Sequence, residues 1–206
     1  MPNNANFYRH LAARFPADLS TSAIVTGQNA DYSWREVDQA SAKIANLFDS
    51  LNLPTKAKLA VHIEKSPEAL IVYLAAWRAG LTLVSIPVQA HTEETQSALK
   101  ASAPAVVICS PRHFGWLAQS AFQHGASHVF TLHQSYPNHG SLLHRAALLS
   151  NEFSAPITQD DDIALIRCNW SDGNPTQRPS THQELITLVD LSLTTLHELT
   201  GFKLAF

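Results

Sequence analysis

The chain has 206 residues, of which 45% are hydrophobic and 15% charged, so it can bury a core and is not disordered throughout. Its net charge of −3 provides no basic field for a nucleic-acid backbone, and no apolar run approaches the length of a membrane span. Two cysteines make no disulfide framework, and the N-terminal residues lack the apolar stretch of a signal peptide. We therefore expect a cytoplasmic protein without a nucleic-acid or membrane partner.

The N-terminal part predicts a short helix followed by a long, capped one. Residues 6–15 carry apolar side chains at positions i, i+4 and i+8, which predicts a short amphipathic helix. Ser33 and Glu36 have the spacing of a capping box, in which the serine hydroxyl accepts the backbone N–H of Glu36 and the carboxylate reaches back. A helix is therefore expected from Trp34 to Leu51, with its apolar side chains along one face.

Short apolar strands and helices then alternate along the chain. Ser66 and Pro67 suit the N-cap and first position of a helix, and Gly80 suits its end. The expected elements are a strand at 59–63, a helix at 67–79, a strand at 81–88, a helix at 92–102, a strand at 105–109, a helix at 111–124, a strand at 127–132, a helix at 141–149, a strand at 163–166 and a helix at 182–199. Because this alternation is typical of buried parallel strands, we predict an α/β fold with a mainly parallel sheet flanked by helices.

The segment between the last strand and the last helix is the candidate binding site. Residues 169–180 contain glycine and prolines and are predicted to form a turn-rich loop. A loop at the carboxyl end of a parallel strand can present backbone N–H groups to phosphate. Its surroundings hold no lysine, and Arg167 and Arg178 are the cations there. The residues alone leave a phosphate site and an ordinary surface turn both open, and they favour the turn.

The histidines and cysteines do not predict a metal site or a nucleophile. His124, His128 and His133 are close in sequence, but no Cys-x-x-Cys or His-Glu-x-x-His pattern accompanies them. Cys109 lies in an expected buried strand, where a thiol behaves as a small hydrophobic group. Nothing in the sequence marks Cys168 as a nucleophile. We expect no metal-binding residue in this chain.

Several stretches of the chain, beginning with residues 32–37, YSWREV, follow the pattern of a known family. This first stretch is similar to the opening L-T/S-Y-x-E-L of the adenylate-forming (AMP-binding) enzymes, a superfamily that includes acyl-CoA synthetases, nonribosomal adenylation domains and luciferase. Residues 58–87 resemble their segment VAVxxxKSxExLxxxLAxxRAGxxxxPL, in wording most like that of the malonyl-CoA synthetase branch. Residues 103–109, 161–166 and 181–185 fit the following family strand and the two flanks of the phosphate loop.

The family's phosphate-loop signature, Y-T-S-G-T-T-G-x-P-K-G, is altered in residues 167–178 of this chain. A threonine replaces the lysine, a glutamine replaces the last glycine, and Trp-Ser-Asp replaces small, hydroxyl-rich residues. The aspartate, Asp172, would repel a triphosphate. The residues of this degenerate remnant that remain candidates for cofactor binding are Ser171, Gly173, Asn174, Thr176 and Arg178.

The resemblance implies that residues 1–206 form a single, truncated N-terminal subdomain of the family fold. Family members are much longer, and their adenine pocket, acid pocket, magnesium-binding glutamate and catalytic lysine lie in the part that this sequence does not include. The resemblance therefore assigns no catalytic or metal-binding role to any residue of this chain, and no cofactor is expected.

We predict a degenerate, acyl-CoA synthetase-like pseudoenzyme that is not catalytic alone and acts by binding a protein partner or a second copy of itself. One alternative is a component of an ATP-dependent acid–thiol ligase, of the malonyl- or short acyl-CoA synthetase type, completed by another chain and using ATP and magnesium. The other alternative is a non-catalytic binder of a nucleotide or acyl group. Its pocket would be lined by Arg167, Ser171, Asn174, Thr176 and Arg178.

Overall fold

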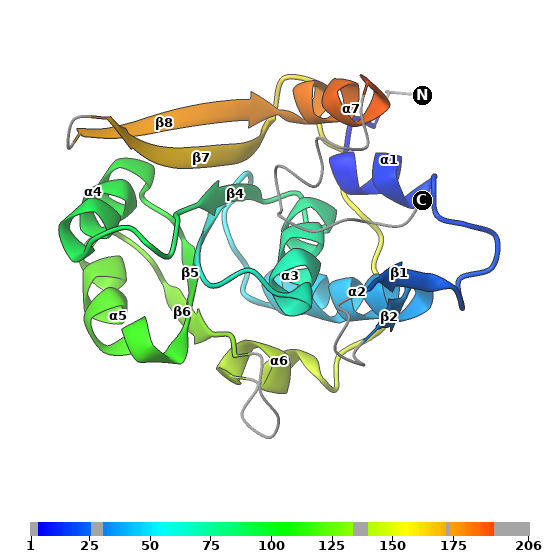
Figure 1. Ribbon diagram of the computed structural model, residues 1–206, viewed down its shortest axis with the longest axis horizontal. Coiled ribbons are helices and arrows are strands. Elements are labelled where there is room, and N and C mark those ends of the chain that lie inside the picture. The colour runs from blue at the N-terminus through cyan, green and yellow to red at the C-terminus, as the bar shows by residue number, and fades with distance from the viewer. Residues whose placement is uncertain (1–3, 26–30, 134–139, 172–173, 192–206) are drawn as a thin grey trace.

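The computed structural model describes residues 4–25, 31–133, 140–171 and 174–191, and its centre is a six-stranded sheet (Figure 1). The strands follow the order β6-β5-β3-β4-β7-β8. They are β3 (Lys58–His62), β4 (Thr82–Ser85), β5 (Val106–Cys109), β6 (His128–Thr131), β7 (Ile163–Ser171) and β8 (Asn174–Thr181). Neighbouring strands are parallel except β7 and β8, which are antiparallel. This confirms the predicted α/β class with a mainly parallel sheet.

Helices cover both faces of the sheet. They are α1 (Phe7–Ala12), α2 (Trp34–Ser50), α3 (Pro67–Arg78), α4 (Thr92–Ser102), α5 (Phe114–Gln123), α6 (Gly140–Ala146) and α7 (His182–Leu191). Apolar side chains of α1, α2, α3, α6 and α7 pack in one core cluster, and those of α4 and α5 pack in a second cluster. Among the described residues, no helix is both long and apolar enough to cross a bilayer.

The connections between these elements include a short hairpin and a 3₁₀ turn. A small hairpin of β1 (Ser22–Ile24) and β2 (Tyr32–Ser33) joins α1 to α2. A 3₁₀ turn, η1 (Pro111–His113), precedes α5, so the single helix expected at 111–124 is divided. The helix expected at 182–199 is described to Leu191, and its remainder lies outside the described residues.

Two serines cap the helices that the sequence predicted. The Ser33 hydroxyl accepts the Glu36 N–H at 3.3 Å, and the Glu36 carboxylate accepts the Ser33 N–H at 2.8 Å, which completes the capping box of α2. The Ser66 hydroxyl accepts the Ala69 N–H at 3.1 Å at the start of α3. Gly80 follows α3 with φ +72°, a conformation that glycine adopts without strain.

A buried arginine joins three helices on one face of the sheet. Arg78, at the end of α3, is 7% exposed, and its guanidinium donates to the Asp38 carboxylate of α2 at 2.7 Å. It also donates to the Tyr8 hydroxyl of α1 at 2.7 Å and to the Phe153 carbonyl at 3.2 Å. Because several donors of one fork are satisfied at once, this side chain fixes the positions of α1, α2 and α3.

Two tryptophans are part of the core. Trp34 and Trp77 are each 1% exposed. The Trp77 indole N–H donates to the Ala164 carbonyl of β7 at 3.0 Å, so α3 is also tied to the sheet.

Candidate functional site

The segment expected to be a loop is an antiparallel hairpin of β7 and β8. β7 continues to Ser171 and β8 begins at Asn174, so the prediction of a turn-rich loop over 169–180 is wrong. The register places Arg167 opposite Arg178 on the two strands. Figure 1 shows the hairpin along one side of the molecule, where β8 contacts α4.

The alternation of polar and apolar residues along β7 is the sequence signal that could have revealed this strand. Cys168 is buried and Trp170 is partly buried against the core cluster of α4 and α5, whereas Arg167 and Asn169 are exposed. This two-residue period is typical of a strand with one buried face. The glycine and prolines of the segment favoured a turn instead, although proline is accepted in an edge strand.

The residues predicted for the phosphate-loop remnant lie along this hairpin. Ser171 ends β7 and pairs with Asn174, the first residue of β8. Thr176 and Arg178 follow on β8, are exposed, and lie two residues apart on the same face. Gly173 lies outside the described residues, as does the aspartate before it. The role of this set in cofactor binding stays a prediction.

The hairpin offers few of the groups that a phosphate site needs. A phosphate cradle uses backbone N–H groups that point at the ligand. β7 instead pairs with β8 along Ile163–Ser171 and with β4 at Leu165–Arg167. Pro175 and Pro179 contribute no N–H to β8. The Thr176 hydroxyl donates to the Asn169 carbonyl at 3.2 Å.

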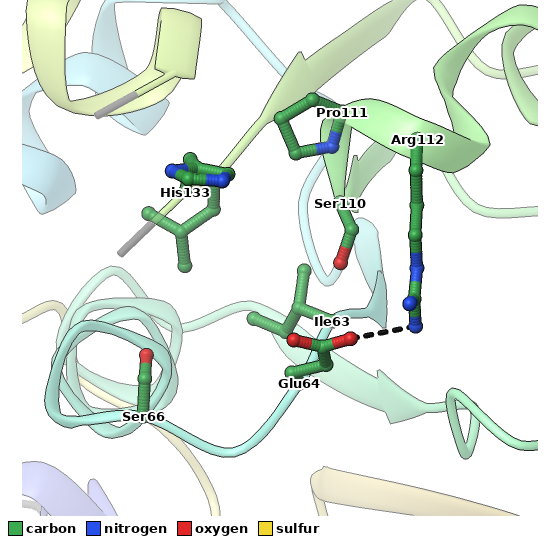
Figure 2. A pocket seen from close by; sticks show the side chains of 8 residues that line it. Ile63, Glu64, Ser66, Ser110, Pro111, Arg112 and His133 are labelled. Atoms are coloured by element: carbon green, nitrogen blue, oxygen red, sulfur yellow. Dashed lines mark ion pairs between the residues drawn. The ribbon is translucent and has the colours of Figure 1, made fainter. Parts of the chain in front are cut away.

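A cavity of about 540 Å³ opens at the carboxyl ends of β3, β5 and β6 (Figure 2). β3 leads to α3 on one face of the sheet, and its neighbour β5 leads to α5 on the other, so the two loops separate here. In open α/β sheets ligands bind at such a switch point. The residues that line the cavity are Ile63, Glu64, Ser66, Ser110, Pro111, Arg112, Leu132 and His133.

An ion pair joins the two loops of this crevice. Glu64 follows β3 and Arg112 follows β5, and their side chains meet at 2.6 Å, as Figure 2 shows. The two side chains are 50% and 60% exposed, so solvent screens the pair and it contributes at most about 1 kcal/mol. The ion pair therefore joins the two loops but contributes little to holding them in place.

Two imidazoles lie next to the crevice. The rings of His62, at the end of β3, and His113 are 4.9 Å apart, and Trp116 contacts both. Burial, with a contribution from His113, lowers the pKa of His62 to about 4, and burial also lowers the pKa of His113. Both rings are therefore neutral near pH 7. Among the described residues, no three His, Cys, Asp or Glu side chains are arranged to hold a metal ion.

Both cysteines are buried thiols. Burial raises the pKa of Cys109 to about 12 and the pKa of Cys168 to about 11. Because the thiolate is the reactive form, neither residue is suited to nucleophilic chemistry at neutral pH. The interpretation of Cys109 as a small hydrophobic core residue is confirmed, since it is 0% exposed in the cluster beneath α4 and α5.

The arrangement of strands and the segments at their carboxyl ends match a known enzyme family. The AMP-binding enzyme family matches residues 9–167 of this chain. The chain belongs to the AMP-binding enzyme family. Its sheet, with helices on both faces, is that of the N-terminal part of the adenylate-forming enzymes, as predicted.

Several AMP-binding enzymes are similar to this chain. MatB from Rhodopseudomonas palustris, a malonyl-CoA synthetase, superposes with a TM-score of 0.80 over 91% of this chain at 29% identity, and its ATP-bound form gives 0.81. The crotonobetaine/carnitine–CoA ligase of Escherichia coli is 22% identical over 162 residues, or 75% of this chain. The nonribosomal peptide synthetase 5 of Gibberella zeae is 24% identical over 93 residues, or 45% of this chain.

This AMP-binding chain spans about a third of these acyl-CoA ligases. It covers 31% of the carnitine–CoA ligase and 38% of MatB. The family match covers residues 9–167, which contain β3 to β6 and the crevice. This partial likeness does not show that the chain has the activity of the complete enzymes.

Sequence reasoning missed the crevice. The sequence patterns assign Glu64 to a family segment and Ser66 to a helix cap, and they assign no role to Arg112. A signal existed, because each follows an expected strand at its carboxyl end. The missing information was the strand order, which makes the residues after β3 and those after β5 neighbours.

Proposed function

We propose that this acyl-CoA synthetase-like chain of the AMP-binding family is non-catalytic and acts by binding a protein partner. The observation that supports the proposal is the composition of the β7–β8 hairpin, where the resemblance places the phosphate loop of the family. Its described residues contain no lysine, and Thr176 stands where the resemblance places that lysine.

Electrostatics supports this proposal. Transfer of an adenylyl group needs preorganised donors and cations where charge develops on the phosphates. The described residues of β7 and β8 supply two cations, Arg167 and Arg178, and no lysine. The two strands pair with each other along the hairpin, and Pro175 and Pro179 of β8 have no backbone N–H.

The packing supports a function that needs a stable fold. Arg78 and Trp77 join helices and sheet through buried hydrogen bonds, so the structural part of the family pattern is intact. A protein whose fold is kept while its phosphate-binding groups are replaced is suited to recognition of another macromolecule.

The test is ATP binding and adenylation by the purified chain. We expect no ATP–pyrophosphate exchange above background with malonate, and no calorimetric heat with Mg-ATP up to millimolar concentration. MatB from Rhodopseudomonas palustris serves as the positive control in both assays. Saturable heat at micromolar Mg-ATP that is lost in Arg178→Ala would contradict the proposal, because it would show a working nucleotide site.

A second function is favoured by how well the chain matches the ATP-bound form of MatB. A region that superposes over 91% of its length could be one part of a ligase completed by another chain, using malonate or another short acid, ATP and magnesium. Co-expression with the remaining part of MatB tests this directly. ATP-dependent malonyl-CoA formation by the mixture, absent with either part alone, would favour the ligase over the non-catalytic function.

A further inference from the structure

Two arginines of the hairpin are held side by side. The register makes Arg167 of β7 and Arg178 of β8 direct neighbours, and opposite residues of an antiparallel pair project from the same face, about 5 Å apart. Both are exposed. Like charges in such a pair are destabilising. A local rule that is broken in this way is typical of a site selected for function rather than stability.

No counter-charge for the two guanidiniums is found in the described part of the chain. None of the ion pairs there includes Arg167 or Arg178, and the described residues of β7 and β8 contain no Asp or Glu. The acids on either side are engaged elsewhere, since Asp162 pairs with a lysine and Glu184 accepts the N–H of Thr181 at 3.1 Å. Asp172 lies outside the described residues.

The core fixes which way this pair faces. Cys168 and Trp170 pack against the cluster of α4 and α5, so the neighbouring Arg167 projects from the opposite face of the hairpin. On that face the next pair is Asn169 and Thr176, and both are exposed. We call the four residues Arg167, Asn169, Thr176 and Arg178 the arginine face. It is polar, and the arginines are its only ionisable groups among the described residues.

A cavity lies next to the arginine face, and β8 forms the neighbouring edge of the sheet. Arg167 also neighbours Ser85 of β4, which lines a cavity of about 350 Å³ together with Tyr73 and Glu64. The Glu64 carboxylate is paired with Arg112. The cavity gives an incoming segment a place for a side chain next to the arginines. Addition of a strand to β8 is disfavoured, because two of its residues are prolines without an N–H.

We propose that the arginine face is the docking surface for a carboxylate-rich segment of a protein partner. This deepens the proposed function and rests on it. Paired guanidiniums match carboxylates through parallel N–H bonds, and arginine is enriched at protein interfaces. A contact to Arg167 and Arg178 removes their mutual repulsion at the same time.

The experiment uses a labelled octaglutamate peptide as the probe and fluorescence anisotropy at low salt as the readout. The variant Arg167→Gln/Arg178→Gln is compared with Arg9→Gln/Arg35→Gln, which removes two other exposed arginines and so gives the same net charge. We expect affinity to fall about tenfold in the first variant and less than about twofold in the second. Octaglutamine should bind neither protein.

Three outcomes would overturn the proposal. Equal weakening in both variants would mean that net charge alone attracts the peptide, and absence of binding by the unmodified chain would remove the surface altogether. Dimerisation of the chain in sedimentation that is lost only in Arg167→Gln/Arg178→Gln would assign the face to a second copy.

A third measurement separates failure of this inference from failure of the proposed function. Inorganic tripolyphosphate and Mg-ATP are titrated against the same variants. If they bind tightly through the arginine face while octaglutamate does not, the face is a nucleotide site and both proposals fail. If no ligand binds, the docking inference fails, while the absence of ATP binding still agrees with a non-catalytic chain.

Discussion

Two regions of the molecule differ in how their arginines are placed. One is the face formed by α1, α2 and α3, and the other is the β7–β8 hairpin. In the first region, Arg78 is buried and satisfied by a carboxylate, a hydroxyl and a carbonyl from three segments. In the second, Arg167 and Arg178 are exposed and face each other without a described counter-charge. The same residue type is therefore structural in one place and available for binding in the other.

This difference indicates which residues of the AMP-binding family pattern the chain retains. The RAG tripeptide at the end of α3 is present, and each of its outer residues has a structural task in the packing. The β7–β8 hairpin, where the resemblance places the phosphate loop, contains no lysine among its described residues. We propose that fold and chemistry are carried by separate sets of residues, and four experiments test the contrast between the two regions.

The largest effect is expected for Arg78→Ala. This change leaves the Asp38 carboxylate and the Tyr8 hydroxyl without their buried partner, and loss of one member of a buried pair costs about 4 kcal/mol. Urea unfolding measures it. Arg112→Ala is the matched control, because its pair with Glu64 is exposed and should cost less than about 1 kcal/mol. Similar losses in the two variants would refute the contrast between the regions.

Gly80→Ala is expected to have the second largest effect on the free energy of unfolding. At φ +72° an alanine is strained, and its Cβ would lie 2.8 Å from Cγ of Pro156 in the connection to β7. Strain and overpacking together should lower the free energy of unfolding by about 3 kcal/mol. Gly115→Ala is the control, because nothing lies near that Cβ and alanine favours a helix. The control should be neutral or slightly stabilising in thermal unfolding.

Acid should destabilise the protein through two buried histidines. Burial lowers the pKa of His62 and of His182 to about 4, and Nδ1 of His182 accepts the Phe7 N–H at 3.1 Å. Below the ordinary pKa of 6.5 the unfolded chain binds more protons than the folded one, so stability is full above that pH and falls as the pH approaches 4. We expect each histidine to remove about 2 kcal/mol by about pH 5.

Urea unfolding across this pH range measures the effect. His62→Gln should flatten the pH dependence by one histidine's share. A His62→Gln curve parallel to that of the unmodified chain would show that this ring does not titrate on unfolding.

The smallest effect concerns the arginine face. Arg178→Thr should raise the free energy of unfolding by about 0.5 kcal/mol, because it removes a like charge opposite Arg167 and adds a residue that favours strands. The double variant Arg167→Thr/Arg178→Thr should gain less than the sum of the single variants, since either one abolishes the repulsion. Additive gains in a double-mutant cycle would show that the two side chains do not interact.

The sequence alone determined the elements whose signals are local. Ser33, Ser66 and Gly80 set helix ends through hydrogen bonds and backbone angles that depend on a few neighbouring residues. The apolar strands were recognisable because a strand buried on both faces needs hydrophobic residues throughout. From these two signals the α/β class and the mainly parallel sheet followed, and the structure confirms both.

Only the tertiary structure decided the hairpin and the crevice. β8 has a sequence that favours turns, and it becomes a strand because β7 pairs with it and α4 contacts it. The pairing of Arg167 with Arg178 is a matter of register, and the contact of Glu64 with Arg112 depends on β3 and β5 being neighbours. Strand order and register are set by packing among residues far apart in the chain, which local sequence patterns do not contain.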